Sequence, residues 1–173
     1  MSDGIRPRPR DDVDLMRPDR LVLFDLINEA RAHPENYPPD GNSSGASMSA
    51  CPSPVRYSQQ LSDIARDHND DLASRDIIWV NLVDHMHRGP DGKLTSAVGQ
   101  PMDRAGYHTF RGENVATGFP TAAEVLHFWM QDDERWKWGH RNLILNCLVQ
   151  EGGIAHLQGG SGGHYWTLDL GTK

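Results

Sequence analysis

The chain lacks the features that would place it in several large classes of protein. Its 173 residues include only two cysteines and no internal repeat. No apolar run approaches the roughly 20 residues that a membrane span needs. Basic residues are also scarce, 17 against 24 acidic ones, which gives a formal net charge of −7. Because phosphate contacts require clustered lysine and arginine, this balance argues against a general nucleic-acid-binding protein.

The two cysteines, Cys51 and Cys147, leave three outcomes open. They form a disulfide if the fold brings their Cα atoms within about 7 Å of each other, and an oxidising compartment favours that outcome. They could instead be two small buried apolar side chains, or they could bind a metal. Metal binding by these thiols is disfavoured because the sequence has no Cys-x-x-Cys pair.

The first 17 residues have little apolar content and are rich in proline, arginine and aspartate. They have no positively charged start followed by an apolar stretch, so we expect no signal peptide in the chain as given. The remaining length suits one domain that buries on the order of 70% of its unfolded surface. We therefore expect a tail at residues 1–17 and a single domain at residues 18–173.

Apolar periodicity predicts two helices in the first half of the chain. One begins at Pro18 and ends at Pro34. The other spans residues 61–72, where apolar residues recur at helical spacing. His68 falls on the apolar stripe of this second helix, a position where a histidine is more often a hydrogen-bonded core residue than a ligand.

Shorter elements follow, and the order of helices, mixed elements and strands indicates an α+β layered domain. The apolar run at residues 77–80 fits a strand or the plug of a helix end. Thr121 and Glu124 form a capping box that begins a helix. We expect further short helices at residues 94–106 and 141–146, and strands at residues 152–157 and 164–170.

Three segments each place an ionisable side chain near a glycine: HRGPDG at residues 87–92, GENVA at residues 112–116 and GHRNLILN at residues 139–146. The imidazoles of His87 and His140 and the carboxylate of Glu113 could converge on a divalent metal. On these residues alone, the simpler interpretation is that Glu113 satisfies backbone donors at a turn and His140 caps the following helix.

In this order, the motifs resemble the CAP superfamily of cysteine-rich secretory, antigen 5 and pathogenesis-related type 1 proteins, and specifically its bacterial-style SCP-like extracellular domain. The resemblance covers residues 21–171 and includes LINEAR at residues 26–31 and YWTLDLG at residues 165–171. It implies a three-layer α-β-α sandwich with a mainly antiparallel central sheet and an open surface cleft. It also implies secretion, because members of the family are mostly secreted.

The resemblance further implies a cleft with two histidines and two acidic residues, and in some members a divalent ion, often zinc. By motif position, His87 and His140 match the two histidines and are the predicted metal ligands. Glu113 matches the first acid, which is predicted to bind a ligand and to act as the base if the protein is a hydrolase.

The second acid of the cleft is Asp132 by motif position, because it lies three residues after Trp129. Extra residues before His140 leave Asp133 and Glu134 as alternatives, and bacterial-style members often lack this acid altogether. Glu124 is not a candidate, because the capping box already uses it.

His85 lies two residues before His87, so both imidazoles would share a face if this segment is a strand. His85 is therefore a rival or additional ligand. No role is assigned to His33, His108, His127 or His156.

Three functions fit these observations. The first is a secreted module whose cleft binds a divalent metal, with zinc as the candidate cofactor, and a lipid, sterol-like or peptide ligand. The second is a metal-assisted peptidase or esterase that uses the same residues, with Glu113 as general base. The third is a non-catalytic structural or interaction domain without metal. Binding ranks above catalysis because the second acid is not settled.

Overall fold

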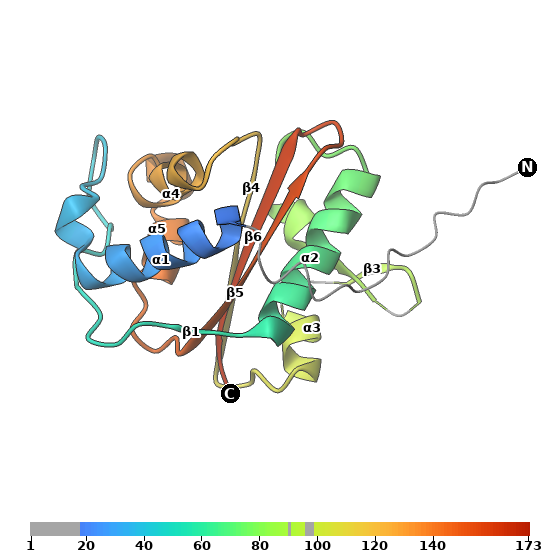
Figure 1. Cartoon of the computed structure of the whole chain (residues 1–173), viewed down its shortest axis with the longest axis horizontal. Coiled ribbons are helices and arrows are strands. Elements are labelled where there is room, and N and C mark those ends of the chain that lie inside the picture. Colours follow the sequence, from blue (N-terminus) through green and yellow to red (C-terminus); the bar gives the residue numbers. More distant parts are fainter. Residues whose placement is uncertain (1–17, 90, 96–98) are drawn as a thin grey trace, which may run out of the picture.

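A four-stranded sheet forms the centre of the computed structural model, which describes residues 18–89, 91–95 and 99–173 (Figure 1). The strands lie in the order β1-β5-β6-β4. β1 runs parallel to β5, whereas the β5–β6 and β6–β4 pairs are antiparallel. The strands are β1 (Arg56–Tyr57), β4 (Phe110–Thr117), β5 (Glu151–Gln158) and β6 (His164–Thr172).

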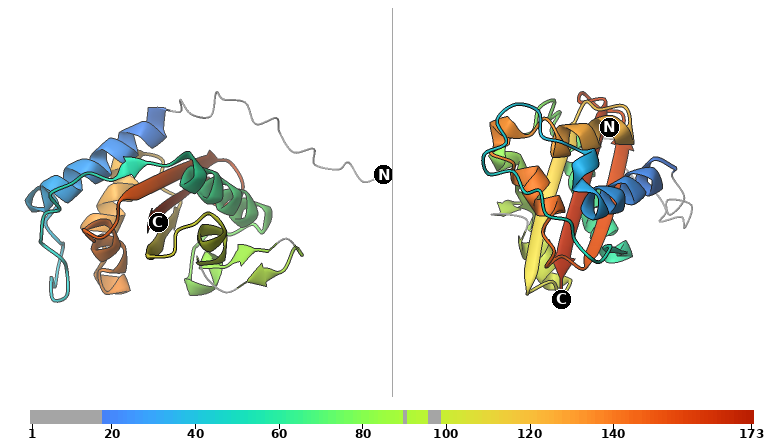
Figure 2. Two further views of the ribbon diagram at one scale, coloured as in Figure 1. Left: turned by 90° about the horizontal axis from the view of Figure 1, so that it is seen from below. Right: turned by 90° about the vertical axis from the view of Figure 1, so that its left-hand side faces the viewer.

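Helices cover both faces of this sheet (Figure 2). The layer on one face consists of α1 (Pro18–Ala32), α4 (Ala122–Met130) and α5 (Gly139–Ile144). The other layer consists of α2 (Gln59–Ser74) and α3 (Gly99–Arg104). The smaller elements are the 3-10 helices η2 (Pro34–Asn36), η3 (Leu82–His85) and η4 (Glu134–Trp136), and a two-stranded sheet of β2 (His87–Arg88) and β3 (Leu94–Thr95). This arrangement confirms the predicted α+β sandwich with a mainly antiparallel sheet.

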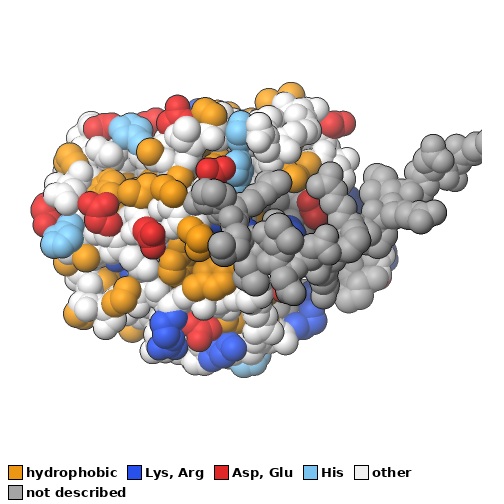
Figure 3. All heavy atoms as spheres, viewed as in Figure 1, with side chains coloured by type: hydrophobic (Ala, Val, Ile, Leu, Met, Phe, Trp, Pro, Cys, Tyr) orange, Lys and Arg blue, Asp and Glu red, His pale blue; other side chains and the backbone are white. Residues whose placement is uncertain are grey.

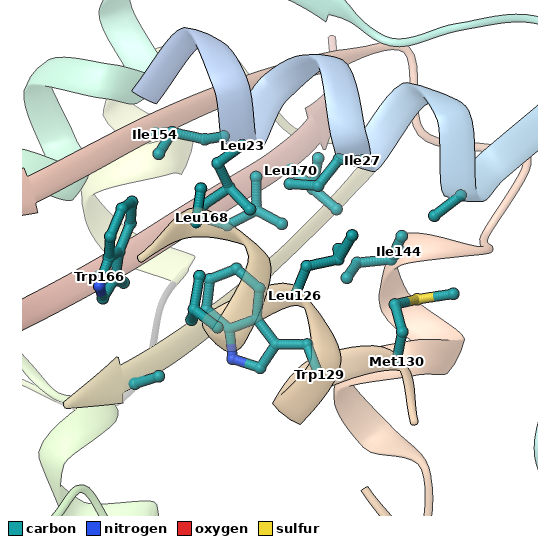
Figure 4. Close-up of a cluster of buried hydrophobic side chains, with 14 of the residues drawn as sticks. Leu23, Ile27, Leu126, Trp129, Met130, Ile144, Ile154, Trp166, Leu168 and Leu170 are labelled. Carbon is teal, nitrogen blue, oxygen red and sulfur yellow. The ribbon is translucent and has the colours of Figure 1, made fainter. Parts of the chain in front are cut away.

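The alternation of side chains along β6 divides the core between the two layers. Trp166, Leu168 and Leu170 point into the larger apolar cluster, which they share with side chains of α1 and α4 (Figure 4). The residues between them point the other way: the hydroxyl of Thr167 donates to a side chain of α2. Asp169 therefore also lies on the α2 side of the sheet.

Most predicted elements are present, with ends shifted by a few residues. The predicted strands at residues 152–157 and 164–170 form the greater part of β5 and β6. The capping box of α4 is complete, because the Thr121 hydroxyl accepts from the Glu124 backbone and the Glu124 carboxylate accepts from the Thr121 backbone. These elements depend on local patterns, which is why the sequence predicts them.

The apolar segment at residues 77–80 does not form a strand. Asp76 has a φ of 55°, which turns the chain as α2 ends. Ile77 then packs against the core, as a helix-end plug does, while Ile78 and Trp79 are 66% and 58% exposed. Ile78 and Trp79 therefore lie at the surface, whereas Val80 packs against the core again.

Cys51 and Cys147 form a disulfide, which settles the alternatives that the sequence left open. Their Cα atoms lie 5.2 Å apart, and the bond joins the loop before β1 to the loop after α5. No helix in the described ranges is long and apolar enough to span a membrane. The predicted tail at residues 1–17 lies outside the described residues. On the face shown in Figure 3, lysine and arginine side chains lie mainly along the lower edge, among acidic ones.

Gly153 of β5 lies directly against the first turns of α2. A Cβ at this position would overlap the backbone of Leu61 and Ser62 in the first turns of α2. The hydroxyl of Ser62 in turn accepts a hydrogen bond from the backbone of Ile154 at 3.0 Å. Gly153 therefore sets how closely α2, which carries His68, approaches the sheet.

We expect Gly153→Ala to destabilise the fold by about 3 kcal/mol or more, because the added methyl group displaces backbone rather than a flexible side chain. Urea unfolding monitored by tryptophan fluorescence measures this change. Gly139→Ala is the matched control, since a Cβ at Gly139 meets nothing within 4 Å. Equal stability of the two variants would contradict the proposed close packing.

Candidate functional site

Glu113 of β4 is the centre of a buried polar cluster. Its Oε1 lies 2.9 Å from Nδ1 of His85, and its Oε2 lies 2.7 Å from Nε2 of His87. Nε2 of His68 lies 3.6 Å from Oε1, which is too far for a hydrogen bond. The side chains of Glu113 and His68 are fully buried. We call these four residues the Glu113 cluster.

Three different elements bring the histidines to Glu113. His68 lies in α2, His85 ends η3 and His87 begins β2. Asp71, one turn after His68, accepts a hydrogen bond from Arg88 and so ties α2 to the strand that carries His87. The condition under which His85 and His87 would share the face of a strand is not met, because His85 belongs to a 3-10 helix. It nevertheless reaches the same carboxylate.

Glu113 is ionised at neutral pH. Burial alone would raise its pKa, but the positive charge that His68 carries when it is protonated, and the hydrogen bonds from His85 and His87, outweigh burial and keep the pKa well below its usual range. Because a carboxylate only accepts hydrogen bonds, the nitrogens that face it carry the protons. We therefore assign the proton of His85 to Nδ1 and a proton of His87 to Nε2.

His68 lacks the hydrogen bonds of an ordinary core histidine. Both ring nitrogens are buried, and neither has a hydrogen-bond partner among the residues that the structure describes. Its ring stacks on that of His87, with the centroids 4.0 Å apart. Burial lowers the pKa of His68 to about 4, so it is neutral at neutral pH. The prediction of a hydrogen-bonded core histidine is therefore wrong.

Asp169 of β6 is a buried member of the site that the sequence analysis missed. It pairs with Glu113 across the β4–β6 ladder and is completely buried. Burial, and then the neighbouring charge of Glu113, raise the pKa of Asp169 well above its usual range. The signal for it was the alternation of β6, since the neighbours Leu168 and Leu170 point into the opposite layer.

His140 lies in the other layer of the domain, in the first turn of α5. Its Nδ1 is 2.6 Å from Oδ1 of Asp133, whose other oxygen accepts from the backbone of Arg141 at 3.1 Å. Asp133 is completely buried, whereas Asp132 is exposed. The acid beside His140 is thus Asp133, one of the alternatives, and the predicted choice of Asp132 places the acid one residue too early.

The reason lies in the turn that ends α4. The backbone N–H groups of Gln131 and Asp132 both donate to the carbonyl of His127, so α4 ends in a turn wider than an α-helical one, and Asp133 is the residue that is buried after it. The simpler interpretation of His140 as a helix cap does not hold either, because Trp138 is the N-cap residue of α5, and Asp133 rather than His140 accepts from a backbone N–H of its first turn.

Two cavities lie against the Glu113 cluster. The first, which we call the cleft, has a volume of about 220 Å³ and is lined by Glu113, His85 and, from the opposite layer, His140. Its apolar walls include Trp79, Val80, Phe119, Phe128 and Leu143. The second cavity, of about 360 Å³, is lined by His68 and His87 and by charged residues that include Asp67, Asp71, Arg88 and Arg104. The cluster therefore separates an apolar cavity from a charged one.

The floor of the cleft is the outer edge of β4, because the five consecutive residues 113–117 of that strand line it. Within the described ranges, no strand pairs with this edge. The N–H of Gly118, just after β4, donates to the carbonyl of His164. Because hydrogen-bonded pairs alternate along an antiparallel ladder, the main-chain groups of the even-numbered residues of β4 are the ones that bond to β6. The main-chain groups of Glu113, Val115 and Thr117 therefore point away from β6, toward the cleft.

The geometry singles out three residues that could hold a divalent cation. One ligand atom from each of His68, His87 and Glu113 lies within 4.8 Å of the other two. Two imidazoles and a carboxylate are a set that Zn²⁺ accepts. The unpartnered nitrogens of His68 fit this set, because a metal would supply the missing partner. His140 is not in the group, and its Nδ1 is engaged by Asp133.

Residues 24–170 match the model of the CAP (cysteine-rich secretory protein) family. The chain belongs to this family. The match confirms the relationship inferred from the motifs and covers most of the domain. A search of curated proteins finds no match to this CAP domain.

Solved structures share the fold at low sequence identity. An outer surface protein of Borrelia burgdorferi superposes with a TM-score of 0.58 at 13% identity, covering 88% of this chain and 91% of that protein. Venom allergen-like protein 4 of Schistosoma mansoni superposes with a TM-score of 0.53 at 11% identity, covering 90% of this chain and 89% of that protein. A cysteine-rich secretory protein of Staphylococcus aureus superposes with a TM-score of 0.53 at 18% identity. The match covers 98% of this chain but only 42% of that protein. These likenesses confirm the CAP-type fold.

The burial of neutral His68 predicts a pH-dependent stability. Its pKa of about 4 in the folded state lies below the value of about 6.5 of an unfolded histidine. As the pH falls below about 6.5, His68 takes up a proton in the unfolded chain but not in the folded protein. The free energy of unfolding therefore decreases until the pH reaches the folded-state pKa of about 4. The full loss is on the order of 3 kcal/mol.

We expect His68→Gln to flatten the decline in unfolding free energy between about pH 6.5 and 5. This window lies above the ordinary pKa of carboxylates, so their protonation contributes little to the decline. Urea unfolding with a chelator present measures it. His108→Gln is the control, since the His108 side chain is 70% exposed. A His68→Gln profile parallel to that of the native protein would contradict the assignment of a buried neutral imidazole.

Proposed function

We propose that this CAP domain is an extracellular binding module that binds a divalent metal at the Glu113 cluster and an extended peptide along β4. The observation that carries the proposal is the position of the outer β4 edge on the floor of an apolar cleft beside the cluster. The disulfide and the family, which is typically secreted, support the extracellular location, because disulfides persist in oxidising compartments.

The proposed metal ligands are His68, His87 and Glu113, with zinc as the first candidate ion. Their mutual distances and the unpartnered nitrogens of His68 support this choice. The metal would replace the proton on Nε2 of His87, which now donates to Glu113. The sequence-based proposal of His87 with His140 is the competing ligand set.

The two ligand sets are separated by metal analysis of single variants. We expect bound zinc in the native protein, and one equivalent less in His87→Gln and His68→Gln, because each change removes an imidazole ligand. His140→Gln is expected to keep that equivalent. Mass spectrometry of dialysed protein and calorimetric titration measure both quantities.

The exposed His108→Gln variant is the control for loss of a histidine elsewhere. Loss of zinc in His140→Gln but not in His68→Gln would overturn the inner ligand set in favour of His87 with His140. Absence of zinc binding by the native protein would contradict the metal proposal as a whole.

Binding is favoured over hydrolysis by the state of Glu113. A general base needs a pKa near the working pH and a lone pair directed at the proton it removes. Both oxygens of Glu113 accept hydrogen bonds from histidines, and its pKa is kept well below the usual range. Glu113 is therefore suited to be a ligand or anchor rather than a base.

A peptide is favoured over a lipid or sterol by hydrogen-bonding chemistry. The main-chain groups of Glu113, Val115 and Thr117 point toward the cleft, and an apolar ligand that displaced water from them would leave them unpaired, at a cost of about 1–3 kcal/mol each. An extended peptide pairs with such an edge by adding a strand. The apolar walls then receive its side chains.

We expect short linear peptides selected from a display library on the immobilised protein to slow hydrogen exchange at the amides of Val115 and Thr117. Peptides N-methylated at alternate residues are expected to lose binding, since they cannot donate to the β4 edge. Nuclear magnetic resonance of the complex measures both effects. A fluorescent sterol and a fatty acid are the comparison ligands. Peptides that bind without protecting these amides, or binding by the lipids alone, would contradict the peptide proposal.

A further inference from the structure

A second pair of histidines lies on the face of the sheet opposite to the Glu113 cluster. His156 of β5 and His164 of β6 lie on neighbouring strands, with Nε2 of His156 3.0 Å from Nδ1 of His164. Their rings are within 9° of parallel and their centroids are 5.2 Å apart, so the two nitrogens face each other edge to edge. Neither histidine lines the cleft or the second cavity.

The surroundings hold the ring of His156 in a fixed orientation. Its side chain is only 3% exposed and stacks on the indole of Trp166, with the centroids 3.7 Å apart and the planes within 7°. That indole is itself fixed, because its N–H donates to the carbonyl of Phe119 at 2.7 Å. On the other side of the ring, a carboxylate oxygen of Asp19 lies 3.6 Å from Nδ1. At this distance the two atoms form no hydrogen bond, but the negative charge of the carboxylate favours the proton on Nδ1 and leaves Nε2 as the ligand atom.

We propose that His156 and His164 bind a late first-row divalent cation, at a site separate from the cleft. Two imidazoles that bind one cation at bond lengths of about 2.0 Å and angles of 90–110° have nitrogens about 2.8–3.3 Å apart. The observed 3.0 Å lies in this range. His164 is only half-buried, which gives the ion an entry path and lets its ring rotate to direct Nδ1 at the ion.

Binding of the cation leaves the protons balanced. Before binding, Nδ1 of His164 donates its proton to Nε2 of His156. On binding, that proton moves to Nε2 of His164, on the solvent side, and both facing nitrogens offer lone pairs to the ion. The pair remains neutral, and water completes the coordination. By the usual order of affinity for nitrogen ligands, Cu²⁺ binds more tightly than Zn²⁺.

The test uses the full chain as the His87→Gln/His140→Gln variant, which lacks one histidine of the proposed zinc-ligand set and one of the competing set, and Cu²⁺ as the probe. We expect one Cu²⁺ whose electron paramagnetic resonance spectrum shows coupling to two nitrogens, together with quenching of tryptophan fluorescence because the site adjoins Trp166. Adding His164→Gln is expected to weaken Cu²⁺ binding at least about tenfold and to remove one nitrogen coupling.

His108→Gln in the same background is the matched control, because it removes an exposed histidine and is expected to change neither signal. His164 is the variant of choice, since the buried His156 is needed for packing against Trp166. Cu²⁺ binding that His164→Gln leaves unchanged would overturn the proposal, because the ion would then lie on another group such as the N-terminal amine. Absence of Cu²⁺ binding in the background variant, confirmed as folded by circular dichroism, would overturn it as well.

Discussion

The ionised carboxylate of Glu113, buried at the edge of the central sheet, is the constraint on which the rest of the site depends. Removing such a charge from water costs several kcal/mol unless hydrogen bonds compensate for it. His85 and His87 provide these bonds, and the raised pKa of the neighbouring Asp169 disfavours a second negative charge beside the first. Both histidines come from the segment after α2. Their two hydrogen bonds to Glu113 therefore also fix the path of that segment against β4.

The position of β4 connects this cluster to the cleft. The Glu113 side chain projects toward the α2 layer, while the main-chain groups of the same residue point outward from the sheet edge. The same strand therefore contributes a side chain to the Glu113 cluster and main-chain groups to the cleft. His140 reaches the cleft from the opposite layer, held by Asp133 rather than by the Glu113 cluster. The two-residue alternation of β5 and β6 likewise separates His156 and His164 from the cluster by the thickness of the sheet.

Much of the fold could be predicted because it depends on local patterns, such as the period of α2, the cap at Thr121 and the alternation of β6. The candidate site was predicted only in part, namely for the residues His87, Glu113 and His140, which lie within recognisable sequence motifs. Asp133 could not be preferred over Asp132, because the turn that ends α4 has no local signature. The unpartnered state of His68 and the contact of His156 with a second histidine depend on strand register and long-range packing, which local sequence patterns do not reveal.

The measurement that tests the account most directly is the protonation of the histidine rings by ¹⁵N nuclear magnetic resonance of the metal-free protein at neutral pH. With ionised Glu113 at the centre of the cluster, we expect His85 to be protonated on Nδ1 and His87 on Nε2, and His68 to stay neutral until the pH approaches its pKa of about 4. We also expect Glu113→Gln to shift the His85 and His87 signals. Unprotonated nitrogens facing Glu113, or signals that Glu113→Gln leaves unchanged, would contradict the central role of this carboxylate.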